Sequence, residues 1–180
     1  MIGRRFKAHS PRLKAMQDHF QRLGLPRRFS VDSDALEAAY LAKSREAHPD
    51  FHALGTAAEQ DASLRDTAAV NEAYLILRDS FRRADYLLGL LGGPTAGQQK
   101  DMPQAFLMEM MDLRERMEAV MTAGDEVKLA AMEADLEKRM TGTFETVGKL
   151  FDTEPVPLVA ARRELNAAKV VKGLLRDLRA

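Results

Sequence analysis

Pro49 is the residue that most constrains the fold of this chain, because it interrupts an otherwise helical pattern. Proline has no backbone N–H to donate, and it disfavours helical backbone angles in the residue before it. We therefore expect a helix over residues 34–47 to end just before His48. The tripeptide His48-Pro49-Asp50 then occupies a stiff loop between two helices, a position where functional side chains are common.

Apolar residues at helical spacing predict further helices, and runs of β-branched residues are nearly absent. Asp32, Ser33 and Asp34 can each cap the helix before the tripeptide, and Asp34 with Glu37 has the spacing of a capping box. A short helical turn is expected near residues 18–23. Longer helices are expected over residues 57–77, 81–91, 103–122, 125–151 and 156–179.

The helix after the tripeptide is expected to pack against the helix before it. Only some nine residues join the two, which favours antiparallel neighbours. The expected packed face of the second helix follows an alternating 4-3-4-3 spacing, broadened by three further side chains. This face comprises Leu64, Ala68, Asn71, Leu75 and Arg78, with Val70, Tyr74 and Leu77 beside them.

A glycine- and proline-containing run over residues 92–97 marks the clearest boundary in the chain. Beyond it, three amphipathic helices with short turns predict an antiparallel three-helix bundle. The expected protein is all-α, with a carboxy-terminal bundle after a smaller amino-terminal helical domain. The expected divisions are a flexible basic tail (1–17), a first domain (18–91), a linker (92–102) and the bundle (103–180).

Charge and composition exclude several classes of function. Lysine plus arginine equals aspartate plus glutamate at 27 each, so the whole chain has no strong attraction for nucleic acid. No apolar run is long enough to cross a bilayer, and the absence of cysteine excludes disulfides and thiolate metal sites. Residues 1–28 nevertheless carry eight basic groups and one acid, while residues 101–137 carry ten acids and three bases.

The basic start of the chain leaves two alternatives open. It has no apolar core, so it is not a secretory signal, although a short organellar transit segment remains an alternative to a solvated tail. Arg4, Arg5, Lys7 and Lys14 could attract nucleic acid or an anionic membrane. Only Phe6 and Phe20 offer aromatic rings nearby, so we expect neither partner.

His48 and His52 raise the alternative of a metal or catalytic site. Two histidines four residues apart share a helix face only in a helix, and Pro49 opposes helix there. No glutamate or third histidine stands nearby at ligand spacing, and a His48–Asp50 dyad lacks a nucleophile and an oxyanion device. We therefore expect no metal, no cofactor and no enzymatic activity.

The first helix after the linker carries more apolar residues than a simple bundle requires. Advancing 100° per residue, Phe106, Met110, Leu113, Met117 and Val120 form one stripe suited to a core. A second set lies on the far side among acids. Two interpretations remain: a wide stripe that touches several neighbours, or an exposed patch in which methionine adapts to a partner. This second set comprises Leu107, Met108, Met111, Asp112, Glu115 and Glu118.

Three motifs in order resemble a J domain, the module that binds ATP-driven DnaK-type chaperones. They are the tripeptide His48-Pro49-Asp50, the run from Val70 to Asp79 and the run from Arg82 to Leu88. The resemblance covers about residues 18–91 and implies a helical hairpin with short flanking helices. It departs from many J domains at Phe51, where they place a lysine.

The J-domain resemblance implies specific chaperone contacts. In that family the loop tripeptide and the basic face of the preceding helix dock on the chaperone and trigger ATP hydrolysis. Carried over by position, this implicates His48, Pro49 and Asp50. Lys43 and Arg45, expected on the side of the helix away from its apolar residues, would add electrostatic contacts with an acidic surface.

The run from Ala105 to Glu115 is similar to the signature of HscB-type co-chaperones of iron–sulfur cluster assembly, and the order of domains agrees. In that family the bundle holds the cluster scaffold protein IscU and presents it to the chaperone HscA. The resemblance implies an aromatic contact from the last helix, where Val170 or Val171 stands here. It also implies scaffold contacts at Leu107, Met108, Met111, Asp112 and Glu115.

The resemblance therefore implies a co-chaperone that stimulates an HscA/DnaK-type ATPase and delivers IscU, supporting maturation of iron–sulfur proteins. The alternative is a general J-protein co-chaperone of DnaK with other protein clients. The implied location is the cytoplasm of a bacterium, or the mitochondrial matrix of a eukaryote.

Overall fold

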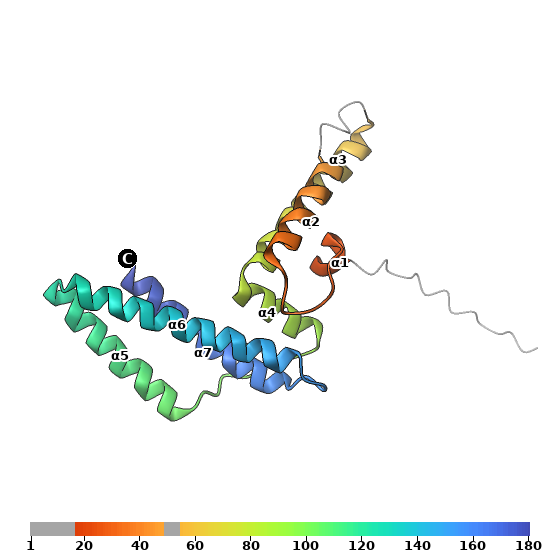
Figure 1. Ribbon diagram of the computed structural model, residues 1–180. Helices are drawn as coiled ribbons and strands as arrows, with labels where there is room; N and C mark the ends of the chain where they lie inside the picture. Colours follow the sequence, from red (N-terminus) through yellow and green to blue (C-terminus); the bar gives the residue numbers. More distant parts are fainter. Residues whose placement is uncertain (1–16, 49–54) are drawn as a thin grey trace, which may run out of the picture.

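The computed structural model of the protein describes residues 17–48 and 55–180. Over these residues the chain forms seven helices and no strand (Figure 1). Each predicted helix is present, with ends within two residues of those expected, so the all-α prediction is confirmed. In chain order the helices are α1 (His19–Leu23), α2 (Ser33–Glu46), α3 (Ala57–Arg78), α4 (Ser80–Leu90), α5 (Gln104–Ala123), α6 (Glu126–Phe151) and α7 (Leu158–Leu178).

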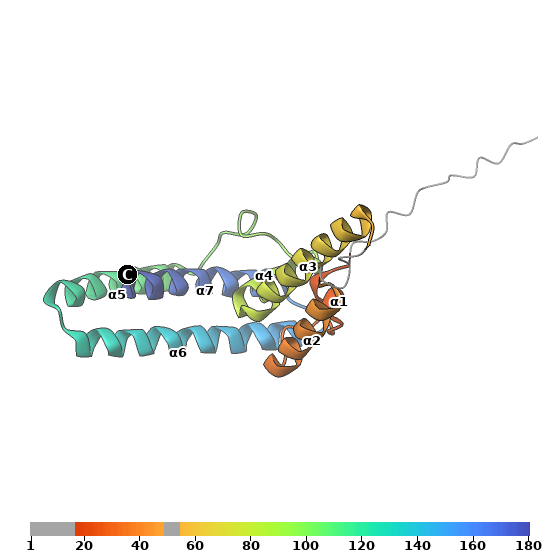
Figure 2. The same cartoon turned by 90° about the horizontal axis from the view of Figure 1, so that it is seen from above.

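The helices form two arms that meet at an angle. α2 and α3 project together from one end of a long bundle made of α5, α6 and α7 (Figures 1 and 2). α1 packs on α2 and α3, while α4 contacts α3 on one side and α6 and α7 on the other. α4 therefore joins the short arm to the long one.

The first two helices each begin at an aspartate. The carboxylate of Asp18 accepts a hydrogen bond from the backbone N–H of Gln21 at 2.9 Å, and the Gln21 side chain accepts one from Asp18 in return. Asp32 caps α2 by accepting from the N–H of Ala35 at 2.7 Å. The capping box expected at Asp34 is therefore wrong, because Asp34 lies within the first turn.

Aromatic and polar side chains join α2 to α3. The rings of Tyr40 and Tyr74 stack with their centroids 4.2 Å apart, and the Tyr40 hydroxyl donates to Asn71 at 3.1 Å. The Tyr74 hydroxyl donates a short hydrogen bond to the Glu37 carboxylate, which raises the pKa of Tyr74. The expected antiparallel pairing of the two helices is thus present.

The packed face of α3 differs from the expected one. Val70 and Leu77 are buried as expected, together with Ser63 and Ala73, whereas Leu64 is 57% and Leu75 is 49% exposed. Both sets have helical spacing, so periodicity alone did not decide between them. The small side chains of Ser63 and Ala73 allow α3 to pack against α1 and α2 together, and this leaves Leu64 and Leu75 facing outward.

Arg83 in α4 is a buried cation, only 9% exposed. Its Nη1 donates to the backbone carbonyl of Leu77 at 2.5 Å, and its guanidinium lies 5.2 Å from the ring centroid of Phe29. Burial lowers the pKa of Arg83. A backbone carbonyl and an aromatic face thus replace part of the lost hydration, and they tie α4 to the end of α3 and to Phe29.

The bundle helices enclose a core of their own. The predicted core stripe of α5 is confirmed, because its three central residues are each at most 5% exposed. The closely packed residues of this bundle core are Met110, Leu113 and Met117 from α5, Leu136 from α6, and Val171, Leu174 and Leu175 from α7.

The core of the short arm continues into the bundle. Phe29, which precedes α2, stacks on Phe144 and Phe151 of α6, with centroid distances of 6.3 and 5.9 Å. Gly148 lies below the ring, since a Cβ there would stand 3.4 Å from an atom of Phe29. The same core also includes Ala161 and Leu165 of α7. One continuous core therefore holds the two arms together.

The segment between α4 and α5 is attached to α7 at two points. Arg162, 5% exposed, donates from Nε to the carbonyl of Pro94 at 2.7 Å and pairs with Asp85 at 2.6 Å. Asn166 donates to the carbonyl of Gln99 at 2.8 Å. This segment therefore lies along the surface of α7.

Candidate functional site

The end of α2 positions the first residue of the predicted loop motif. α2 ends at Glu46 with Ala47 as its cap, as the proline predicts, and His48 follows with its side chain at the exposed surface. The backbone N–H of His48 donates to the carbonyl of Arg45 at 3.2 Å. Pro49 and Asp50, the other two residues of the motif, lie outside the described residues.

Two hydroxyls of α3 hold the end of α2 in place. Ser63 and Thr67 both donate to the backbone carbonyl of Ala47, at 2.8 and 2.7 Å. This carbonyl is one of those that a helix end leaves without an intrahelical donor. α3 itself begins at a capping box in which Thr56 and Glu59 exchange hydrogen bonds. Backbone groups at the end of α2 and at the start of α3 thus have hydrogen-bond partners on both sides of the motif.

Lys43 and Arg45, the two cations predicted beside the motif, lie on different sides of α2. Arg45 is exposed and pairs with no carboxylate among the described residues. Lys43 pairs with Glu46 at 2.7 Å and lines a polar depression with Ala47 and Asp66. The expectation that both face away from the core is wrong for Lys43. It lies three residues after Tyr40 and four before Ala47, so helical rotation turns it toward α3.

The second predicted surface is a patch on α5, which we call the α5 patch and define as Leu107, Met108, Met111, Asp112 and Glu115. Its apolar members are 39%, 58% and 64% exposed in chain order, and both acids are exposed. Of the two interpretations left open by the sequence, the wide packed stripe is therefore wrong. The patch lies on the outer surface of the bundle.

Two exposed ion pairs flank the α5 patch, which faces outward because the opposite side of α5 packs in the bundle core. On one side Glu109 accepts from Arg139 of α6 at 2.7 Å, and on the other Arg114 binds Asp177 of α7 at 3.1 Å. The hydrogen bonds that Arg139 donates to Asp135 and Glu109 raise the pKa of Arg139, despite partial burial. The patch lies between these ion pairs, on the side away from the core. Sequence reasoning did not identify them, although they flank it at helical spacing.

The α5 patch combines apolar area with unneutralised acid. The carboxylates of Asp112 and Glu115 pair with no cation in the part of the chain that the structure describes. Leu107, Met108 and Met111 lie beside them on the same outer surface. Methionine is flexible and adapts to irregular partner surfaces, while exposed acid favours a basic partner. This arrangement suits a protein contact with both apolar and basic character.

The last helix contributes little to this surface at the position where the resemblance implied an aromatic residue. Val171 is only 3% exposed and belongs to the bundle core. Val170 is half-buried and packs against the same core. Of the two candidates, only Val170 thus remains partly accessible.

The described residues contain no cluster of three or more side chains suited to a metal ion. His52, the second histidine of the metal alternative, lies outside them. In the same part of the chain, no helix is long and apolar enough to span a bilayer.

Comparison with known proteins finds a family model and a curated relative that match this chain. The family described as "HSCB C-terminal oligomerisation domain" matches residues 102–176, which include the whole α5 patch. A curated relative, the "Co-chaperone protein HscB homolog" of Ralstonia nicotianae, is 37% identical over 139 residues, which are 77% of this chain and 79% of the relative.

Two solved structures have the same fold. "Chaperone HscB from Vibrio cholerae" superposes with a TM-score of 0.79 at 27% identity, covering 91% of this chain and 96% of that one. The human co-chaperone protein HscB gives a TM-score of 0.81 at 23% identity, covering 98% of this chain and 91% of that one. The resemblance of fold therefore extends over both arms. With the sequence identity to the Ralstonia relative, it shows that this chain belongs to the HscB family of co-chaperones.

Proposed function

We propose that this protein stimulates the ATPase of an HscA/DnaK-type chaperone and delivers an IscU-type iron–sulfur scaffold protein to it. In this role it supports the maturation of iron–sulfur proteins without catalysing a reaction itself. The cluster is cargo of the scaffold, and this chain has no cysteine that could bind it. The exposed, acidic and apolar α5 patch is the observation that carries the proposal.

The proposed division of labour follows the two arms. Residues 18–91 act as the J domain, and His48, Pro49 and Asp50 contact the chaperone, with Arg45 as the outward cation and Lys43 in a secondary role. Residues 103–180 act as the scaffold-binding bundle through Leu107, Met108, Met111, Asp112 and Glu115. Residues 92–102 connect them, and residues 1–17 form the basic tail.

The continuous core supports a mechanism based on effective concentration. A protein that holds client and chaperone at once turns their encounter into an intramolecular event. Such a gain depends on geometry, because sites that cannot be engaged together give none. The stacking of Phe29 on Phe144 and Phe151 keeps the angle between the arms from varying freely. The compartment proposed for this exchange is the bacterial cytoplasm, or the mitochondrial matrix.

The test measures ATP turnover by an HscA-type chaperone, with and without an IscU-type scaffold. We expect His48→Gln to abolish stimulation by this protein, whereas Arg65→Gln, at an exposed position of α3, leaves it unchanged. Unchanged stimulation by His48→Gln would contradict the role of the loop. Both variants alter surface positions, so their folds are checked by circular dichroism.

The second half of the test measures scaffold binding directly. We expect the double variant Leu107→Ala, Met111→Ala to weaken binding of the IscU-type scaffold by at least about tenfold, since each methylene that a partner buries contributes about 0.8 kcal/mol and the variant removes several. Met121→Ala is the matched control, because Met121 is 40% exposed on the same helix but outside the patch. Full binding by the double variant, with chaperone stimulation retained, would favour a general J-protein with other clients.

A further inference from the structure

A concave surface lies where the two arms meet, apart from the loop motif and the α5 patch. We call it the junction groove. It has a volume of about 600 Å³ and forms where the end of α3 and the start of α4 face α7. The residues that line it are Leu75, Arg78, Asp79, Phe81, Arg82, Lys169 and Lys172. It is about 30 Å from the start of α3, given a rise of about 1.5 Å per residue.

The junction groove carries more positive charge than its surroundings neutralise. Four of its side chains are cations, and Asp79 is the only acid among them. Asp79 is already engaged, because its carboxylate accepts from the N–H of Arg82 at 2.9 Å and from Lys172 at 3.2 Å. Burial raises the pKa of Asp79, but the hydrogen bonds from Arg82 and Lys172 together lower it by more, so the pKa is below its usual value. Asp79 therefore stays ionised and neutralises about one cation.

The remaining cations have no acidic partner within the described residues. Arg78 lies with its guanidinium 5.4 Å from the ring centroid of Tyr74, which is a cation–π contact and leaves its charge uncompensated. The side chains of Arg82 and Lys169 form no ion pair with any described carboxylate. By contrast, Arg139 and Arg179 of the bundle each bind two carboxylates.

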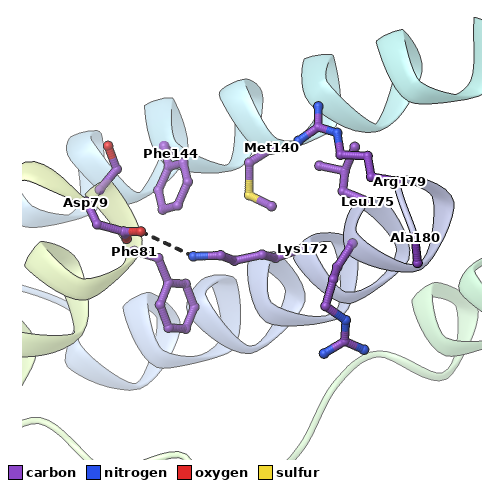
Figure 3. A pocket seen from close by; sticks show the side chains of 10 residues that line it. Asp79, Phe81, Met140, Phe144, Lys172, Leu175, Arg179 and Ala180 are labelled. Carbon is purple, nitrogen blue, oxygen red and sulfur yellow. Dashed lines mark hydrogen bonds and ion pairs between the residues drawn. The ribbon is translucent and has the colours of Figure 1, made fainter. Parts of the chain in front are cut away.

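Apolar side chains stand among these cations. Leu75, which the sequence placed in the core, is 49% exposed, and Phe81 is half-buried below Lys172. Figure 3 shows the adjoining pocket and the ion pair between Asp79 and Lys172. This pocket shares Asp79, Phe81 and Lys172 with the junction groove. A fitting ligand must therefore offer negative charge and at least one apolar group.

We infer that the junction groove binds an acidic segment of a partner protein that carries an aliphatic side chain next to its carboxylates. Three uncompensated cations meet the acids, and Leu75 with Phe81 meets the aliphatic group. Such complementarity speeds association and selects the partner more than it adds affinity. This inference does not depend on the proposed function.

Other occupants fit the groove less well. A nucleic-acid binder that contacts about six to ten phosphates needs more cations than the three left uncompensated here. The chain's own first 16 residues carry five basic groups and no acid, so the groove would repel them. A second copy of the chain could present its acidic α5 patch, and the test below separates that case.

The test uses the full-length protein and a fluorescein-labelled synthetic peptide of four Glu-Leu-Asp repeats, followed by fluorescence anisotropy. We expect Arg82→Glu with Lys169→Glu to weaken binding at least about tenfold and added salt to weaken it in wild type, because exposed charges are screened over about 10 Å at 0.1 M ionic strength. Leu75→Ser should weaken it severalfold. The matched control, Lys149→Glu with Arg163→Glu, reverses two exposed cations outside the groove and should bind like wild type.

Four results would overturn the inference. The first is equal binding by the Arg82→Glu, Lys169→Glu variant, and the second is equal binding of an uncharged peptide of Gln-Leu-Asn repeats. The third is tighter binding of a short DNA duplex that the same variant abolishes. The fourth is self-association in sedimentation that the variant abolishes, which would identify a second copy as the occupant. The charge-reversal variants change only exposed positions, so circular dichroism should show an unchanged fold for each. These positions are Arg82, Lys169, Lys149 and Arg163.

Discussion

Phe29 stacks on Phe151 with ring centroids 5.9 Å apart, although the first precedes α2 and the second ends α6. The contact joins residues far apart in the chain and belongs to both arms. Phe29 is only 7% exposed, and the Arg83 guanidinium covers another side of its ring. Phe29 is therefore buried like a core residue at the junction of the arms.

We predict that Phe29→Ala lowers the free energy of unfolding by about 3–5 kcal/mol, the usual cost of removing a buried phenylalanine. The loss combines the lost transfer of the ring from water with the cavity left between α4 and α6. Urea denaturation followed by circular dichroism measures it. Leu64→Ala, at a position that is 57% exposed, should change the value by less than about 1 kcal/mol. Similar losses for both variants would contradict the packing described here.

The cap of α2 can be tested with a matched pair of aspartates. Asp32→Ala should cost about 1 kcal/mol of stability, because it removes the acceptor for the N–H of Ala35. Asp34→Ala should cost no more than about 0.5 kcal/mol, the effect of one acid in the first turn. Chemical denaturation measures the free energy of unfolding of both variants. A larger loss for Asp34→Ala than for Asp32→Ala would show that Asp34 is the cap of α2, as the sequence suggested.

The hydroxyls of Ser63 and Thr67 are predicted to stabilise the end of α2. Ser63→Ala with Thr67→Val leaves the Ala47 carbonyl without its two donors, so we expect a loss of about 1–2 kcal/mol. Thr122→Val removes a hydroxyl that donates to a carbonyl of its own exposed helix, and it should cost less than about 0.5 kcal/mol. Hydrogen exchange of the amides at the end of α2 should rise in the double variant alone.

His19 predicts a dependence of stability on pH. Burial against Tyr86 lowers the pKa of His19, although the nearby Glu72 and Asp18 oppose the shift and Arg22 adds to it. The pKa in the folded protein is thus below the unfolded value of about 6.5, and the unfolded chain binds more protons. The contribution of neutral His19 to the free energy of unfolding is therefore complete above the unfolded pKa. It is lost as the pH falls through the lower pKa of the folded protein.

Urea denaturation between pH 7.5 and pH 5 checks this prediction. The free energy of unfolding should decline more steeply toward acid in wild type than in His19→Gln, which removes the titrating group. Parallel declines in the two proteins would show that other groups cause the dependence.

The bounds of the helices could be predicted because their signals are local. Pro49 stops α2, and Gly24 and Gly124 adopt positive φ where α1 and α5 end. Asp79 caps α4 within its own turn. Each signal acts over a few residues, so it can be recognised in the sequence without knowledge of the fold.

The faces of the helices were harder to predict, because they depend on what packs against them. Leu75 and Leu77 are both apolar and both lie at helical spacing, yet only Leu77 is buried. The choice follows from the positions of α1 and α2. The stacking partners of Phe29 could not be predicted for the same reason, because Phe144 and Phe151 lie far along the chain.

The α5 patch was predictable as a set of residues but not as a surface. A single helix projection separates Met111 from Met110, and the structure leaves the first 64% and the second 5% exposed. Whether neighbouring helices cover the far side depends on how α6 and α7 are placed. The junction groove had no such signal, because Arg82 and Lys169 belong to different helices and meet only through folding.

The attachment of residues 92–102 to α7 has a consequence for the integrity of the chain. Pro94 and Gln99 are held by Arg162 and Asn166, while Ala96 and Gly97 between them are exposed. A protease that cuts at Gly97 should therefore yield two fragments that stay together and elute as one species. The stacking of Phe29 on Phe144 and Phe151, and the hydrogen bond from Arg162 to Pro94, would hold the two fragments together without the peptide bond.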